Sequence, residues 1–340
     1  MSEPRPSGPR PRVLSGIRPT GAGFQLGNYL GAVRHWAAMQ DEADCFFFLA
    51  DLHALTDVPD PAHLRARTRE SAAELLAMGV DPARSTVFAQ SHIREHAELG
   101  WILGCLTGFG EASRMTQFKD KGGSSSSGAS VGLFTYPVLQ AADILMYQAA
   151  SVPIGEDQRQ HLELTRDLAQ RFNARYGDTF AVPGPYVGKD GARIKDLQDP
   201  TRKMSKSIGG NGTLWVLDAP EVLTKKIKSA VTDTGREVRV DIAEKAGVSN
   251  LLTILSVVTE RPLDALEADF AGKGYGDLKG AVAEAVVAEF APVRKRYAEL
   301  VADPAELDRL LAVGAGRARE VAVATMAAVR ERVGLLAPQP

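Results

Sequence analysis

The sequence predicts an α/β fold in which a doubly wound parallel sheet is followed by a mostly helical part. Through the first half of the chain, short apolar runs that suit strands alternate with longer segments that have helical spacing. After residue 210 the strand signal fades. This alternation favours a parallel sheet with helices on both faces, and such sheets bind ligands beyond the carboxyl ends of their strands.

The expected elements of the first half, in chain order, are a strand beginning at Val13, a helix over 27–40, a strand over 45–50, a helix over 61–79, a strand over 86–90 and a helix over 96–107. The run from Cys45 to Ala50 is apolar throughout, which is typical of a central parallel strand buried on both faces. Pro61 and Gly79 are start and stop signals for the helix between them.

The second half is expected to be mostly helical. Apolar and small residues from Leu307 to Ala328 recur at three- and four-residue steps, which predicts one long amphipathic helix that ends at Gly334. We therefore divide the chain into a proline-rich disordered leader over 1–11, an α/β domain over 12–210 and a helical domain over 211–340.

The composition excludes several classes of protein. The chain has 340 residues, of which 44% are hydrophobic and 24% charged, so it can build a large core, and its net charge of −2 excludes a polycation. Its two cysteines, Cys45 and Cys105, lie in apolar runs without zinc spacing, so we expect buried, reduced thiols and no metal ligands. Since no apolar stretch is long enough to span a membrane and no signal peptide precedes the first strand, we expect a soluble, cytoplasmic protein.

Two segments have the residues to hold a nucleotide between them. Residues 203–207 read Lys-Met-Ser-Lys-Ser, in which lysines flank small hydroxyl side chains that suit a polyphosphate. Residues 15–21 read Ser-Gly-Ile-Arg-Pro-Thr-Gly, a strand-to-helix turn, and Gln-Leu-Gly-Asn follows at 25–28, at the expected helix start. Because the N–H groups at a helix start bind phosphate, the two segments together predict a site for a nucleotide with a polyphosphate group.

These segments belong to a series of blocks in which the chain closely resembles the bacterial class I tryptophanyl-tRNA synthetases, from about Val13 to Gly334. The blocks are Ser-Gly-Ile-Arg-Pro-Thr-Gly with Gln-Leu-Gly-Asn-Tyr-Leu-Gly-Ala (15–32), Ala-Asp-Leu-His-Ala-Leu-Thr (50–56), Arg-Met-Thr-Gln-Phe-Lys-Asp-Lys (114–121), Tyr-Pro-Val-Leu-Gln-Ala-Ala-Asp-Ile-Leu (136–145), Gly-Glu-Asp-Gln-Arg-Gln-His (155–161), Gly-Ala-Arg-Ile (191–194) and Lys-Met-Ser-Lys-Ser (203–207). The resemblance implies a Rossmann-like domain with an inserted connecting segment over about 115–187, a signature loop over 201–209, a homodimer, and anticodon binding by the helical domain.

The activity that the resemblance implies is that of a tryptophan–tRNA ligase, which activates L-tryptophan with ATP and transfers it to the terminal ribose of tRNA(Trp). The attacking carboxylate is already ionised at neutral pH, so the reaction needs alignment and charge stabilisation rather than a general base. With no carboxylate cage in the sequence, Mg²⁺ is expected to arrive on the ATP phosphates. The catalytic residues implied by resemblance are Lys121, Lys203 and Lys206, and the ATP contacts are Arg18, Gln25, Gly27, Asn28, Asp157, Ile194, Lys203, Met204, Ser205 and Lys206.

In the implied tryptophan pocket, Asp143 accepts a hydrogen bond from the indole nitrogen, the only polar group of that side chain. Asp143 follows Tyr136 by two helical turns, so both residues project from one helix face. The other residues implied to contact tryptophan are Leu14, Ser15, Ala50, His53, Gln140, Val152, Ile154 and Gln158.

The chain departs from the commonest bacterial pattern at several of these positions. Arg18 stands where many members have glutamine, Leu14 replaces an aromatic residue, Gln140 replaces a methionine, and Gln25 replaces threonine or histidine. Three competing interpretations therefore stay open. The first is a tyrosyl-tRNA synthetase, whose pocket helix is similar, although the first strand here lacks the second tyrosine ligand of those enzymes. The second is a homologue that has lost its catalytic activity and serves as a binding or regulatory module. The third is a small-molecule nucleotidylyltransferase of similar fold.

Overall fold

A computed structural model describes residues 10–21, 23–115, 130–153, 155, 158–186, 194–205 and 210–336. Residues 1–9 of the expected leader and the serine-rich stretch over 122–129 lie outside these residues. The described part of the chain contains a sheet whose strands are β1 (Arg12–Ile17), β2 (Asp44–Leu49), β3 (Thr86–Ala89), β4 (Ser151–Val152) and β5 (Gly184–Pro185).

The sheet has five strands in the order β3-β2-β1-β4-β5, and every pair is parallel. The chain starts in the middle strand, builds outward to β3, and then returns to add β4 and β5 on the other side. This order confirms the expected doubly wound α/β fold, with the reversal between β1 and β4.

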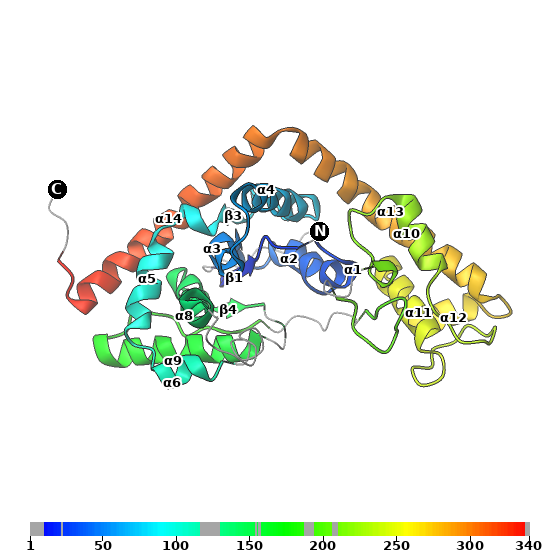
Figure 1. Ribbon diagram of the computed structural model, residues 1–340, viewed down its shortest axis with the longest axis horizontal. Helices are drawn as coiled ribbons and strands as arrows, with labels where there is room; N and C mark the ends of the chain where they lie inside the picture. The colour runs from blue at the N-terminus through cyan, green and yellow to red at the C-terminus, as the bar shows by residue number, and fades with distance from the viewer. Residues whose placement is uncertain are drawn as a thin grey trace, which may run out of the picture.

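Helices that connect these strands cover both faces of the sheet (Figure 1). Their bounds are α1 (Leu26–Asn28), a π-helical turn (Tyr29–Val33), α2 (Arg34–Met39), α3 (Asp51–Ala54), α4 (Pro61–Ala77), α5 (Glu95–Gly104), α6 (Phe109–Ser113), α8 (Val131–Met146) and α9 (Arg159–Tyr176). Side chains of β2 alternate between two cores: Cys45 and Phe47 pack with α2 and α4 in one, and Phe46 and Phe48 pack with α5 and α8 in the other.

The second half is helical, as predicted. Its helices are α10 (Pro220–Lys228), α11 (Ala246–Thr259), α12 (Leu263–Asp269), α13 (Tyr275–Ala302) and α14 (Pro304–Val333). The last two form an arch over the rest of the molecule (Figure 1). Gly334 ends α14 in the left-handed conformation, which confirms the predicted terminator.

Helix α14 returns to the first half of the chain and lies against the edge strand β3. A Cβ atom on Gly314 would lie 1.8 Å from the backbone oxygen of Val87, so only glycine allows this approach. Along the same helix, Leu307 and Leu311 join the core beneath α4, while Ala318 and Met326 join the core beneath α8. The two halves therefore share their apolar cores, and the division at residue 210 stays a prediction.

The expected burial of both cysteines is wrong for one of them. Cys45 on β2 is buried, whereas Cys105 is exposed. Cys105 directly follows the last residue of α5 and faces outward, while Leu103 and Leu106 on either side of it pack against the core, so its apolar neighbours in sequence did not indicate burial. No helix in the described part of the chain is both long and apolar enough to cross a membrane.

Candidate active site

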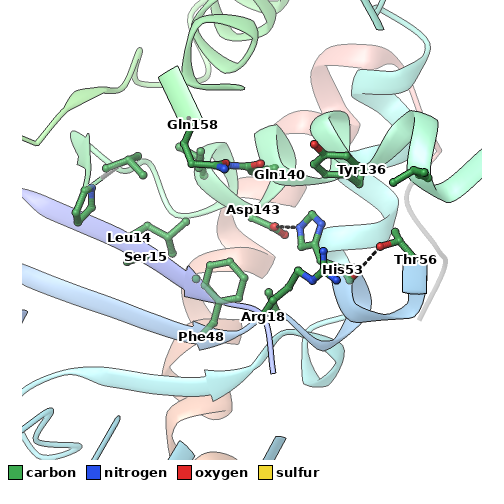
Figure 2. Close-up of a pocket in the computed structure, with 16 residues that line it drawn as sticks. Leu14, Ser15, Arg18, Phe48, His53, Thr56, Tyr136, Gln140, Asp143 and Gln158 are labelled. Carbon is green, nitrogen blue, oxygen red and sulfur yellow. Dashed lines mark hydrogen bonds and ion pairs between the residues drawn. The ribbon is translucent and has the colours of Figure 1, made fainter. Parts of the chain in front are cut away.

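A cavity of about 440 Å³ opens at the carboxyl ends of β1 and β2, where a doubly wound sheet is expected to hold its ligand (Figure 2). Gly16 on β1 allows the cavity floor to form, because a Cβ atom there would lie 2.4 Å from the ring of Phe48. The cavity brings together residues from β1, the turn after β2, helix α8 and the segment before α9. From the predicted tryptophan contacts it collects Leu14, Ser15, Ala50, His53, Tyr136, Gln140, Asp143, Val152 and Gln158.

Among the described residues, Asp143 is the one carboxylate that lines this cavity, and its side chain is 1% exposed. His53 approaches from α3, with its Nε2 atom 2.7 Å from Oδ2 of Asp143. On the other oxygen, Gln90 Nε2 donates over 2.7 Å and His96 Nδ1 lies at 2.6 Å. A buried carboxylate needs such donors, because burial without them would favour its neutral form.

The same contacts keep Asp143 ionised. Burial alone would raise the pKa of the carboxyl group, but the charge of His53 and the hydrogen bonds from His53 and His96 outweigh burial and hold the pKa well below its usual range. The carboxylate is therefore a permanent acceptor at the inner end of the cavity. Such a group suits a ligand whose buried end carries an N–H or O–H donor.

Sequence reasoning missed Gln90, His96 and Tyr147, which support Asp143 from behind. Gln90 and His96 are both 0% exposed; Gln90 directly follows β3 and His96 lies in the first turn of α5, and neither element lines the described cavity wall. A polar residue directly after an apolar strand was a usable signal for Gln90. For His96 and Tyr147 the sequence carried none, because only the packing of α5 on α8 brings them together.

Polar side chains also form the opposite wall of the cavity. The Tyr136 hydroxyl lies 2.8 Å from Nε2 of His161, and the Gln140 amide donates to Oε1 of Gln158 over 3.3 Å. Tyr136 also packs edge-on against His53, with the ring centres 6.2 Å apart. Tyr136 and Gln140 come from α8, and their partners come from the start of α9. The polar groups of this wall suit a polar or charged end of a ligand.

Arg18 lies in this cavity, although the resemblance had suggested a contact with ATP. Its guanidinium forms an ion pair with Asp57, and its side chain extends beside His53 (Figure 2). Burial lowers the pKa of Arg18, and its Nε atom is buried without a hydrogen-bond partner in the described part of the chain. One end of the guanidinium is thus paired with Asp57, while its Nε–H is available to an anionic group of whatever occupies the cavity.

The two predicted nucleotide segments meet, although they are far apart in sequence. Gln25 is 2% exposed, and its amide donates to the backbone oxygen of Met204 over 3.1 Å. The Oε1 atom of the same side chain accepts from the N–H of Gly27 over 2.5 Å and caps the helix start. Gln25 therefore links the helix start at residues 25–28 to the signature loop over 201–209.

Several other predicted ATP contacts lie around this junction. Oδ1 of Asn28 is buried without a hydrogen-bond partner among the described residues, so it is free to accept from a ligand hydroxyl. Met204 donates its N–H to Ile194 over 3.1 Å, and both side chains are buried in the core rather than open to a ligand. Lys203 is exposed and pairs through its backbone with Lys195, and Ser205 accepts from Thr213.

Four predicted site residues, Lys121, Ile154, Asp157 and Lys206, lie outside the described residues. Their predicted contacts stay predictions. Within the described ranges, no group of three or more His, Cys, Asp or Glu side chains is placed to hold a metal ion.

Comparisons with known proteins agree with the fold and identify the family. The family model for class I tRNA synthetases (W and Y) matches residues 7–291. A protein from Streptomyces avermitilis named tryptophan–tRNA ligase 2 is 58% identical over 96% of this chain and 98% of its own length. A tryptophanyl-tRNA synthetase from Mycoplasma pneumoniae superposes with a TM-score of 0.84 at 37% identity, covering 96% of this chain and 98% of that one. A Campylobacter jejuni tryptophanyl-tRNA synthetase complexed with ADP and tryptophan superposes with a TM-score of 0.83 at 35% identity, covering 95% and 100%.

Proposed function

The chain belongs to the class I tryptophanyl-tRNA synthetases, and on that premise we propose that it activates L-tryptophan with ATP and transfers the tryptophanyl group to the 3′-terminal ribose of tRNA(Trp). The observation that carries the proposal is the cavity with an ionised Asp143 at its inner end and apolar walls beside it. An indole has one polar atom, an N–H donor, and this cavity offers an acceptor for it.

The first step joins the tryptophan carboxylate to the α-phosphate of ATP. A carboxylate oxygen attacks the α-phosphorus, the bond to the bridging oxygen breaks, and pyrophosphate leaves with the electron pair. In the second step a ribose hydroxyl of the tRNA attacks the carbonyl carbon, and AMP leaves. Because the nucleophile of the first step is already ionised, alignment and charge stabilisation supply the acceleration, with orientation worth roughly 7–11 kcal/mol.

We assign the ATP to the junction of the turn and the signature loop. There Asn28 would accept from the ribose and Lys203 would meet the departing pyrophosphate, whereas the N–H of Gly27 already donates to Oε1 of Gln25. Lys121 and Lys206 take the same role by resemblance. Mg²⁺ bound through the ATP phosphates would neutralise part of their charge.

Tyrosine activation is the less favoured alternative. A phenol hydroxyl both donates and accepts, so a tyrosine site gains from a second polar partner, and Leu14 occupies the place on β1 from which one would come. Relatives 54–58% identical to this chain over nearly its whole length are named tryptophan–tRNA ligases.

The remaining partners are proposals as well. A homodimer is supported by exposed aromatic and aliphatic side chains on neighbouring elements at one end of the molecule, near the inserted segment: Trp101 on α5 is 76% exposed, and Phe109 on α6 and Val131 on α8 are each 78% exposed. We assign anticodon binding to the helical second half. The cytoplasm is the proposed location, because the substrates are those of protein synthesis.

Amino-acid-dependent exchange of pyrophosphate into ATP tests the proposal, with tryptophan and tyrosine in parallel. We expect exchange with tryptophan alone, abolished in Asp143→Ala and strongly reduced in Lys206→Ala. Exchange with tyrosine would move the chain to the sister family. No exchange with either amino acid would indicate a retired homologue.

A further inference from the structure

A chain of buried hydrogen bonds continues behind the cavity, from Asp143 through His96 to Tyr147. Nδ1 of His96 lies 2.6 Å from Oδ1 of Asp143, and Nε2 of the same ring lies 2.8 Å from the Tyr147 hydroxyl. His96 and Tyr147 are both 0% exposed, and neither lines the cavity. Neither residue therefore touches a ligand, and any effect on the reaction passes through Asp143.

The chemistry of the three groups fixes the direction of the hydrogen bonds. Ionised Asp143 can only accept, so Nδ1 of His96 must carry a proton. Burial, with the charges of Asp143 and Glu95, raises the pKa of the Tyr147 phenol, so the hydroxyl keeps its proton and can donate to Nε2. A His96 ring that donates from Nδ1 and accepts at Nε2 then satisfies both neighbours.

The surroundings allow this chain little freedom. The rings of Phe48 and Phe88 lie 6.1 Å and 6.3 Å from the His96 ring, measured between centres, and Tyr147 packs 5.0 Å from Phe46. Glu95, the preceding residue in the helix, is 4% exposed and faces Arg319 of α14 rather than His96. The ring can neither turn nor reach another acceptor without repacking this core.

The supporting contacts also determine what remains of Asp143 for a ligand. Its two oxygens have about four acceptor positions. Gln90 and His96 take two of them on Oδ1, and His53 takes one on Oδ2. Among the described residues, one acceptor position is left, on an oxygen of a residue that lines the cavity.

We propose that His96 and Tyr147 are positioning residues that hold Asp143 with this one acceptor position directed at the indole N–H, and so select a side chain with a single donor. The proposal rests on the proposed function and goes beyond it, because it assigns specificity to two residues that no substrate touches. Loss of the Tyr147 hydroxyl leaves Nε2 of His96 without its donor. The imidazole can then carry its proton on Nε2 and turn a lone pair toward the carboxylate.

The test compares tryptophan with L-β-(benzothiophen-3-yl)alanine, in which sulfur replaces the indole N–H, in pyrophosphate exchange by wild type and Tyr147→Phe. We expect the ratio of kcat/KM for tryptophan to kcat/KM for the sulfur analogue to fall about tenfold, since a hydrogen bond to a charged group is weakened. The fall should come mainly from a higher KM for tryptophan, with the analogue nearly unchanged. An unchanged ratio, or equal losses for both substrates, would overturn the proposal.

Two variants of His96 test the proposal independently, so it can still be tested if Tyr147→Phe folds poorly. His96→Asn keeps a side-chain donor near the position of Nδ1, whereas His96→Ala removes it. We expect the substrate ratio to fall in the alanine variant and to recover most of its value in the asparagine variant. A similar ratio in both would contradict a positioning role.

Tyr275→Phe is the matched control, because it also removes a tyrosine hydroxyl that is hydrogen-bonded to side chains, here Asp233 at 2.6 Å and Lys245 at 2.8 Å in the helical half. It should change stability and leave the substrate ratio alone. If the wild type shows no exchange with tryptophan, the proposed function fails. The ratio of calorimetric dissociation constants for the two amino acids then still decides whether His96 and Tyr147 set selectivity.

Discussion

Because α14 lies close to β3, we expect alanine substitutions at two glycines of α14 to change the free energy of unfolding in opposite directions. In Gly314→Ala, the new methyl group would lie 1.8 Å from the oxygen and 2.7 Å from the carbonyl carbon of Val87. The obstacle is backbone, so it cannot turn aside as a side chain would, and the helix must retreat from the strand. Gly316 is exposed one half-turn further on, and a methyl group there would meet nothing within 4 Å.

The magnitudes follow from these distances. Overpacking against a rigid neighbour costs about 3 kcal/mol, and alanine returns roughly 0.5–1 kcal/mol of helix stability over glycine. The free energy of unfolding should therefore fall by about 2 kcal/mol in Gly314→Ala and rise by about 0.5–1 kcal/mol in Gly316→Ala. With an unfolding entropy of about 2.1 cal/mol/K per residue, these changes lower and raise the melting temperature by about 3 °C and about 1 °C.

Differential scanning calorimetry and urea titration of the two variants beside wild type measure both changes, and the exposed glycine is the control for helix propensity. The decisive quantity is the difference between the variants, because it does not depend on the absolute stability of the protein. If Gly314→Ala melts at or above the wild-type temperature, α14 does not lie against the backbone of β3.

Three further predictions concern the cavity, the surface ion pairs and the apolar end of the molecule. Arg18→Gln removes a charged partner of the substrate carboxylate, so the calorimetric dissociation constant of L-tryptophan should rise about tenfold. The dissociation constant of L-tryptophanamide, which lacks the carboxylate, should stay nearly unchanged. Equal increases for both ligands would indicate an effect of packing instead. The hydrogen bonds and charge of Arg171 lower the pKa of Glu111 from 4.5 to about 2, so this carboxylate stabilises the fold above pH 4.5. The difference in melting temperature between wild type and Glu111→Gln should shrink as pH falls from 4.5 toward 2, and a constant difference would exclude the ion pair as its cause. Trp101→Ser with Phe109→Ser should convert a dimer to monomers in analytical ultracentrifugation, and a dimer that survives the double change does not use this surface.

Much of the fold was predictable because parallel strands buried on both faces produce continuous apolar runs in the sequence. The unbroken apolar run of β2 and the start and stop residues of α4 are local signals, and both elements formed where expected. The path of α14 was not predictable in this way. Its spacing predicted a helix, but nothing in its own sequence indicates that it returns to an edge strand more than two hundred residues earlier.

The site residues also divide into those that a local sequence pattern predicts and those that only the tertiary structure brings together. Asp143, Tyr136 and Gln140 stand in one helical block, and the structure brings all three to the cavity. The support behind Asp143 depends instead on the packing of α5 against α8, which is a property of the tertiary structure. The role of Gln25 was also hidden, because its link to Met204 joins two segments that no local pattern relates.

The edge of the sheet that α14 covers has a consequence for synthesis of the protein on the ribosome. Strand β3 emerges early, with hydrogen-bonding groups and apolar side chains that find their cover only when the last described helix has been made. During that interval the nascent chain exposes an open strand edge, the kind of surface that pairs with other chains. The sheet is thus completed only after α14 has been made, and the growing polypeptide is a candidate client for ribosome-associated chaperones until then.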